Sequence, residues 1–185
     1  EPRLNTQQLN LFGEGEYSLT PDSASLDVTT AATWELWCAP IFISNERPLI
    51  SKYGTAGEMS WELQVDPTSA RLAFIMAGAD GNFQRTEYWS LNTQGTSMLS
   101  VTFDGGVVKL YQDAILLTLL GSAGGPAPTT LNTGTLPVII GGRPVNGNIV
   151  RTFGGKFGSA KIYNVALTAD EVLTNYNTQK SLYGL

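Results

Sequence analysis

Hydrophobic and polar residues alternate along most of the chain, in short runs separated by Gly, Pro, Asn and Asp. A period of two residues is typical of strands, because successive side chains of a strand point to opposite faces. In one such run Trp61, Leu63 and Val65 share one face. Glu62 and Gln64 take the other face, as in a half-buried strand. The pattern predicts an antiparallel β-protein.

The same alternation predicts short strands along the whole chain. They cover residues 9–12, 25–29, 33–39, 49–53, 60–66, 71–77, 86–91, 99–103, 107–112, 115–119, 138–141 and 158–163. Asp104-Gly105-Gly106 predicts a tight hairpin turn, since Asp and Gly tolerate a positive φ. Residues 33–39 carry Trp34 on one face and Trp37 on the other. This strand is therefore predicted to be central and covered on both sides.

One helix is predicted, near the C-terminus. Thr168 supplies a hydroxyl at the N-cap and Glu171 a carboxylate three residues later, which is the pattern of a capping box. Val172, Leu173 and Tyr176 then form one apolar stripe, so a helix of two or three turns is expected to lie on the sandwich. Residues 121–130, rich in Gly, Ser and Pro, are predicted to be a long surface loop.

Composition excludes several classes of function. The chain has 185 residues, the size of one domain, and it contains no His. Ser-His-Asp catalysis, His-ligated zinc and a His-based pH switch are therefore excluded. The single Cys38 lies in an apolar run without a basic neighbour, which favours a packed thiol over a nucleophile.

The charge balance bears on the partners. Eleven Lys and Arg against 16 Asp and Glu give a net charge of −5 and no basic cluster, which opposes nucleic-acid binding. The longest apolar stretch, residues 115–120, is far shorter than the ~20 residues of a membrane span. We therefore expect a protein that neither binds nucleic acid nor inserts into a membrane. We expect it outside cells or on a virion surface.

Several phrases occur in an order that resembles the LamG-like (laminin G-type) jelly rolls of the concanavalin A-like lectin/glucanase superfamily. They are GEGEY (13–17), TWELW (33–37), LISKYG (49–54), VTFDG (101–105), KLYQDA (109–114), IGG (140–142), FGGKF (153–157), and AKIYNVALT (160–168) leading into DEV (170–172). The resemblance implies an all-β, two-sheet antiparallel jelly-roll sandwich with one short C-terminal helix. It spans about residues 12–176, and we expect a single domain over residues 9–185 preceded by an N-terminal arm, residues 1–8.

Glycosidases of this superfamily carry paired carboxylates, usually on one strand, and no such arrangement occurs here. Glu35 and Glu62 are the remaining pair to consider, but carboxylates on a solvated strand face are common without any catalytic role. We therefore expect no enzymatic activity.

The candidate glycan-binding or partner-binding residues are Asn82, Arg85, Tyr88 and Trp89. Tyr88 and Trp89 are neighbours on a predicted strand, so their rings point to opposite faces and one of them is expected to face outward. The alternative places one ring in the core and covers the other with a loop.

Calcium is the one cofactor to consider, because many relatives carry it at a rim of the sandwich. Glu58, Asn146 and Asn148 are its candidate ligands. Arg143 opposes a dication there, and turn-forming Asn-Gly chemistry explains the two asparagines equally well.

The expected function is non-catalytic binding or adhesion, in which loops recognise a carbohydrate or a protein surface. The alternative is a structural virion protein, such as a capsid decoration, head-fibre or tail component. The two differ in their partners: a glycan or a surface in the first case, a capsid or other assembly scaffold in the second. A homo-oligomer is compatible with both.

Overall fold

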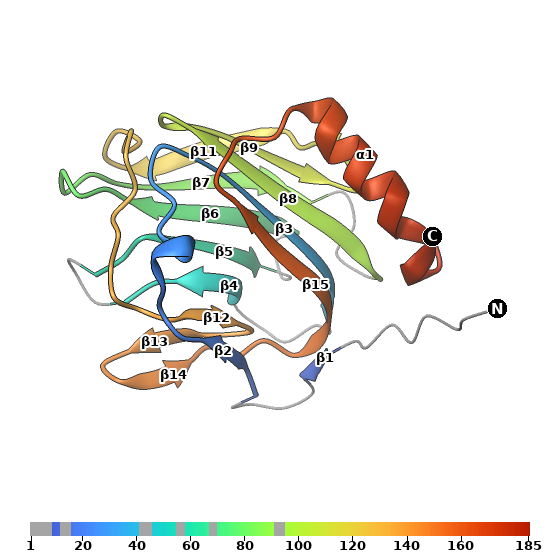
Figure 1. The fold of residues 1–185 in the computed structure, drawn as a ribbon, viewed down its shortest axis with the longest axis horizontal. Helices are drawn as coiled ribbons and strands as arrows, with labels where there is room; N and C mark the ends of the chain where they lie inside the picture. Colours follow the sequence, from blue (N-terminus) through green and yellow to red (C-terminus); the bar gives the residue numbers. More distant parts are fainter. Residues whose placement is uncertain (1–8, 12–15, 41–45, 55–57, 67–69, 91–94) are drawn as a thin grey trace.

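The computed structural model describes residues 9–11, 16–40, 46–54, 58–66, 70–90 and 95–185, and all structural statements concern these residues. Two antiparallel sheets pack face to face (Figure 1). The six-stranded sheet has the order β1 (Leu9–Leu11), β15 (Gly155–Tyr163), β3 (Ala31–Pro40), β8 (Ser97–Asp104), β9 (Val107–Gln112) and β10 (Ile115–Leu116). The seven-stranded sheet has the order β11 (Leu119–Gly124), β7 (Phe83–Trp89), β6 (Arg71–Ala77), β5 (Trp61–Asp66), β4 (Arg47–Lys52), β12 (Val138–Ile140) and β2 (Ser18–Thr20).

Three smaller features complete the fold. A separate hairpin joins β13 (Arg143–Val145) to β14 (Asn148–Val150), and a 3-10 helix, η1, spans Ala24–Leu26. Helix α1 (Ala169–Gln179) is followed by the 3-10 turn η2 (Lys180–Tyr183). The predicted all-β sandwich of two antiparallel sheets with one C-terminal helix is confirmed. No helix in the described part of the chain is both long and apolar enough to span a membrane.

The main core lies between the two sheets, where alternate side chains of each strand meet. Trp34 of β3 is fully buried, and its ring centroid lies 5.1 Å from that of Trp61 and 4.9 Å from that of Phe74. These contacts bridge the two sheets, because Trp34 belongs to one and the other two rings belong to the other. Cys38 is buried in the same core, and burial raises the pKa of its thiol to about 12, as expected for a packed thiol.

A second apolar cluster joins the six-stranded sheet to α1. Figure 1 shows α1 lying against the outer side of that sheet. Trp37 of β3 is stacked 4.1 Å from the ring of Tyr183, and Val172 of α1 is fully buried beside it. β3 is thus covered on both faces, as predicted. The capping box is also present: Glu171 N–H donates to Thr168 Oγ1 (3.3 Å), and Thr168 N–H donates to the Glu171 carboxylate (2.8 Å).

The structure corrects two expectations. Residues 25–29 are not a strand but contain the end of η1, and the aspartates flanking it, Asp22 and Asp27, both hold the buried Lys52 ammonium, at 2.7 and 2.5 Å. Residues 121–130 are not wholly a loop, because β11 pairs with β7 as far as Gly124. The sequence Gly-Ser-Ala-Gly has no hydrophobic alternation, so only pairing with a distant strand reveals this element.

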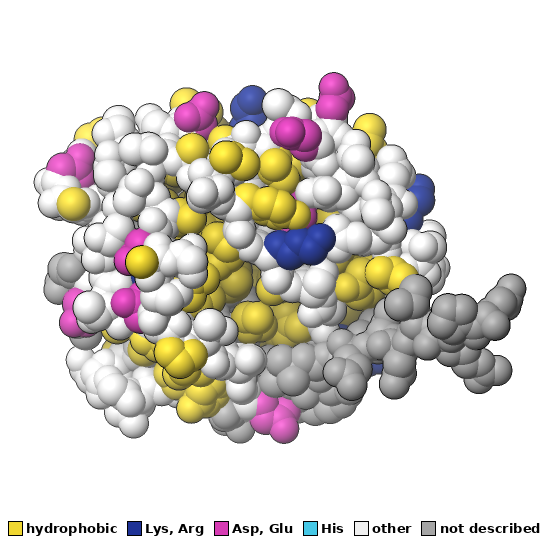
Figure 2. Space-filling model, viewed as in Figure 1, with side chains coloured by type: hydrophobic (Ala, Val, Ile, Leu, Met, Phe, Trp, Pro, Cys, Tyr) yellow, Lys and Arg dark blue, Asp and Glu magenta, His cyan; other side chains and the backbone are white. Residues whose placement is uncertain are grey.

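Charged side chains are sparse on the face that Figure 2 shows, and most lie towards its rim. Hydrophobic side chains gather near its centre. The predicted arm, residues 1–8, lies outside the described residues.

Candidate functional site

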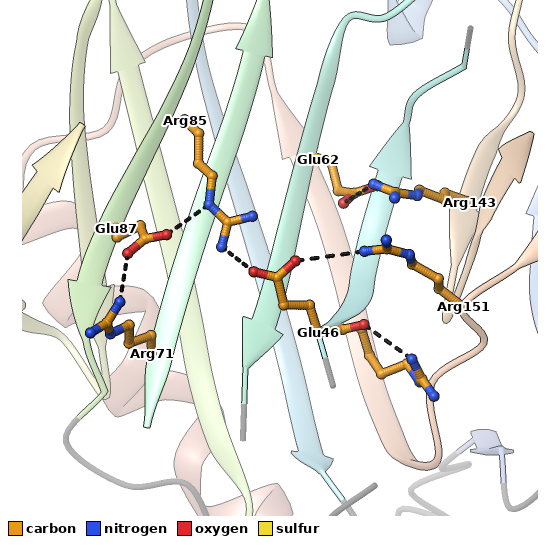
Figure 3. Close-up of polar contacts among 8 residues, drawn as sticks. Glu46, Glu62, Arg71, Arg85, Glu87, Arg143 and Arg151 are labelled. Carbon is orange, nitrogen blue, oxygen red and sulfur yellow. Dashed lines mark hydrogen bonds and ion pairs between the residues drawn. The ribbon is translucent and has the colours of Figure 1, made fainter. Parts of the chain in front are cut away.

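The outer face of the seven-stranded sheet carries a network of charged side chains (Figure 3). They come from alternate positions of neighbouring strands, because the residues between them point into the core. On β5, Glu62 and Gln64 point outward while Leu63 is buried in the core. On β7, Arg85 and Glu87 take the same outer face, which Arg71 of β6 shares. The predicted alternation of β5 is therefore correct.

Four ion pairs run in a chain across this face. Arg71 donates to Glu87 (3.1 Å) and Arg85 donates to the other oxygen of Glu87 (2.8 Å). Arg85 also donates to Glu46 (2.5 Å), whose second oxygen lies 3.6 Å from Arg151. Figure 3 shows these five side chains linked in one row. They come from β6, β7, the residue before β4 and the residue after β14. Glu87 and Glu46 thus each pair with two arginines, and this row of ion pairs begins and ends with an arginine.

Glu62 lies beneath this layer and is fully buried, although we expected its strand to be half-buried. Arg143, from the β13–β14 hairpin, donates to its Oε1 (3.2 Å). Gln64, with its amide oriented to satisfy its neighbours, donates to the same oxygen (2.8 Å) and accepts from Arg85. Oε2 of Glu62 is buried and finds no hydrogen-bond partner among the described residues. Burial raises the pKa of Glu62 to about 7, and Arg143, Arg151 and Arg85 oppose that rise.

The face gathers four arginines of an acidic protein in one place. Arg71, Arg85, Arg143 and Arg151 meet Glu46, Glu62 and Glu87 in the network. Asp66 of β5 takes the same outer face, and the β5–β6 register places it opposite Arg71. The arginines supply planar, bidentate donors of the kind that recognise carboxylates.

An exposed aromatic ring stands at one end of the network. Trp89 is 46% exposed on the outer face of β7, and the Arg71 guanidinium lies 5.6 Å from its ring centroid. Arg71 and Glu87 also line a half-open cavity of about 360 Å³, closed on its other side by Leu120, Gly121, Ser122 and Ala123 of β11. The cavity thus offers a guanidinium, a carboxylate and a strand backbone, and the Trp89 ring lies next to its Arg71 wall. These are groups that can hold a polar, ring-shaped ligand.

The structure places the four residues predicted to bind glycan in different surroundings. Trp89 is the outward-facing ring, and Arg85 lies on the same face of the same strand. Tyr88 is a correction: its ring is buried in the core and its hydroxyl donates to Val108 O (3.1 Å), so it cannot form an exposed platform. Asn82 directly precedes the first residue of β7, at the end of the strand opposite Trp89. There it lies in a turn and donates to Asp80 (2.8 Å).

Arg71 and Glu87 were not predicted as site residues. The register of the β6–β7 hairpin places Arg71 directly opposite Trp89, and Glu87 is two positions from Trp89 on the same face. The predicted strands contained this signal, because alternation from Trp89 reaches Glu87 and Arg85 in turn. The cavity wall from β11 could not be anticipated without that strand.

The structure separates the two carboxylates considered for catalysis. Glu35 of β3 lies on the outer side of the six-stranded sheet, where it accepts from Tyr163 Oη (2.9 Å) and Asn175 Nδ2 (3.0 Å). Glu62 lies on the outer side of the other sheet. With the whole sandwich between them, the two groups cannot act on one glycosidic bond.

The candidate calcium ligands take part in local structure. Asn146 and Gly147 form the two-residue turn of the β13–β14 hairpin, with φ of 50° and 78°. Asn148 donates its amide to Asn146 O (3.3 Å). These are the turn contacts that Asn-Gly favours. Among the described residues, no three acidic or Cys side chains are grouped so as to hold a metal ion. Calcium binding by Glu58, Asn146 and Asn148 stays a prediction.

Several known structures with a similar fold are binding domains. The carbohydrate-binding module CBM40 of the Ruminococcus gnavus IT-sialidase aligns with a TM-score of 0.73 and 15% identity, covering 93% of this chain and 99% of that chain. Its complex with alpha2,3 sialyllactose aligns with a TM-score of 0.73 and 17% identity, covering 92% and 98%. The binding domain of botulinum neurotoxin serotype G aligns with a TM-score of 0.65 and 12% identity, covering 97% of this chain but 48% of that one. At such identities the likeness shows the fold alone.

No curated protein matches the sequence. The family model Laminin_G_3, described as the concanavalin A-like lectin/glucanases superfamily, matches residues 12–173. That match covers most of the chain and every strand of the sandwich except β1. The chain therefore belongs to the concanavalin A-like lectin/glucanases superfamily.

Proposed function

We propose that this domain is a non-catalytic carbohydrate-binding module, and that it binds glycan at the end of the outer face formed by β6, β7 and β11. The observation that carries the proposal is the exposed Trp89 ring, which shares Arg71 with the cavity on that face. A sugar ring stacks its C–H face on an indole while its hydroxyls need donors and acceptors nearby. Glu87, Ser122 and the Arg71 guanidinium supply these groups.

We further propose that the preferred glycan is acidic. Arg71 donates to Glu87 and its side chain is 41% exposed, so it can turn an edge towards a ligand. Its planar guanidinium can bind a carboxylate with two parallel hydrogen bonds. A structural neighbour is bound to alpha2,3 sialyllactose, which makes sialylated glycans the first ligands to test.

The experiment compares alpha2,3-sialyllactose with lactose by isothermal titration calorimetry, after a glycan array has identified the acidic structures bound. We expect binding of the sialylated sugar to weaken by about tenfold or more in Trp89→Ala and in Arg71→Gln, which is about 1.4 kcal/mol each. Leu173→Ala, at an exposed leucine of α1, is the control and should bind as the wild type does. Equal affinity for both sugars rejects the acidic preference. Unchanged binding in both site variants rejects the site.

An exported location follows from this proposal, because glycans of this kind are displayed outside cells. The alternative role in a virion stays a prediction, since no observation on the described residues favours it.

A further inference from the structure

Both sheets end on one side of the sandwich in strands that carry exposed hydrophobic side chains. β10 and β11 are the last strands of their sheets, and the chain runs directly from one to the other. Ile115, Leu116, Leu119 and Leu120 are all exposed along this edge. No charged residue occurs from residue 114 to residue 142. A soluble protein normally protects such an edge with charge, and here the protection is missing.

The backbone of β11 has a free hydrogen-bonding edge. β11 pairs with β7 on one side, and among the described strands none pairs with its other side. Gly125 N–H donates to Phe83 O (2.8 Å), so the backbone N–H and C=O groups of Gly125 point towards β7. In an antiparallel pair these groups point towards the partner strand at every second residue. Counting back along the register, the N–H and C=O of Ser122 point away from β7. All six residues of β11 are exposed, so these groups are open to another extended strand.

We propose that β11 is a self-association edge, at which a second copy of this chain adds its own β11 to extend the seven-stranded sheet. The free backbone groups require an extended strand as the occupant. In a two-fold symmetric contact the edge meets an identical edge, so charges near the symmetry axis repel their own copies, whereas an uncharged edge has no such repulsion. β11 contains neither Lys nor Pro, and its one irregularity is the bulge at Leu120. On a chain with net charge −5, this uncharged apolar edge is suited to a second copy.

Self-association has a consequence that rests on the proposed function. Residues 120–123 form one wall of the cavity beside Trp89, so pairing at β11 places the cavities of two copies on either side of one interface. Two sites on one continuous sheet bind clustered glycans with higher avidity than a single site.

The test is sedimentation velocity over about a hundredfold range of protein concentration. We expect a concentration-dependent dimer. Ser122→Pro removes only the outward N–H, so it should abolish the dimer and leave the melting temperature close to that of the wild type. Ser122→Ala keeps that N–H and should still dimerise. A wild-type protein that stays monomeric throughout, or a dimer that survives in Ser122→Pro, overturns the proposal.

A second pair of variants covers the case in which Ser122→Pro disturbs β11. Ser122 is near the middle of β11, so in a two-fold pairing it lies close to its own copy. Ser122→Lys and Ser122→Glu each place like charges there, so each alone should be monomeric, and an equimolar mixture should regain a heterodimer. Leu173→Lys, on α1, is the matched control and should dimerise. A mixture that stays monomeric while both variants are folded contradicts the proposal. These measurements use no sugar, so their outcome is independent of whether the glycan site exists.

Discussion

The buried carboxyl of Glu62 should make the stability of the domain depend on pH in an unusual direction. Most carboxylates in proteins are stabilised in the charged form, and acid then weakens the fold. Glu62 is fully buried, one of its oxygens has no partner among the described residues, and burial raises its pKa from 4.5 to about 7. The informative substitution is Glu62→Gln, which keeps the shape and the acceptor for Arg143 but cannot titrate.

The sign follows from the direction of the pKa shift. The folded state holds the Glu62 proton more tightly than the unfolded chain, so this group's contribution is fully present below pH 4.5. It is lost as the pH rises towards the folded value of about 7. One unit of pKa corresponds to about 1.4 kcal/mol, so the contribution across this window is about 3 kcal/mol. The window lies near neutrality because the three neighbouring arginines only partly offset the cost of burying the charge.

The assay is urea unfolding at several pH values from about 4.5 to about 7.5, comparing the wild type with Glu62→Gln. Other groups titrate in both proteins, so the difference between the two free energies of unfolding isolates Glu62. We expect that difference to change by about 3 kcal/mol across the window, with the wild type losing stability relative to the variant as the pH rises. Val172→Ala, on α1 at the opposite sheet, lowers stability without touching Glu62, so its curve should stay parallel to that of the wild type. Parallel curves for Glu62→Gln would refute the reasoning.

Three further predictions concern the core and the C-terminus. Lys52→Met removes a fully buried ammonium and leaves its two aspartate partners facing each other, so we expect a loss of about 2 kcal/mol in urea unfolding. A methyl group on Gly158 would overlap the Tyr183 ring, so Gly158→Ala should displace that ring from Trp37 and destabilise the domain by about 1–2 kcal/mol, measured by thermal melting; an unchanged melting temperature contradicts this. Cys38, with a pKa of about 12, should resist thiol-specific reagents in the native state and react in urea, and rapid native labelling at pH 7 would be incompatible with the described core.

Local sequence signals predicted the elements that are stabilised locally. The capping box at Thr168 starts α1 through contacts within four residues. The opposite phases of Trp34 and Trp37 indicated that β3 is covered on both faces, because alternation alone decides which face each ring takes. Such features need no knowledge of the partner strand.

Features assembled from distant parts of the chain escaped prediction. Arg143 contacts Glu62 across 81 residues, and Arg85 contacts Glu46 across 39. No local pattern marks such pairs, since they depend on strand order and register. Lys52 is a further example, because alternation on β4 correctly places it on the same inward face as Ile50. A lysine on that face looks out of place until its two aspartate partners are known. These flank η1, a 3-10 helix where the sequence predicted a strand.

The arrangement of the outer face shows how one network can both stabilise the sheet and remain available to a ligand. Arg85 and Arg143 are held in its middle and largely covered, and each is bonded to a carboxylate that the sheet positions. Arg71 and Arg151 form the two ends, where their side chains are 41% and 46% exposed. Exposed ion pairs are worth about 1 kcal/mol or less, so an incoming carboxylate can exchange for Glu87 on Arg71 at small cost. Exchange at the buried Arg143 instead leaves Glu62 charged without its partner. If the proposed function holds, ligand recognition should therefore concentrate at the exposed ends. Of these, Arg71 is the one that, among the described residues, lies beside an aromatic ring and lines a cavity.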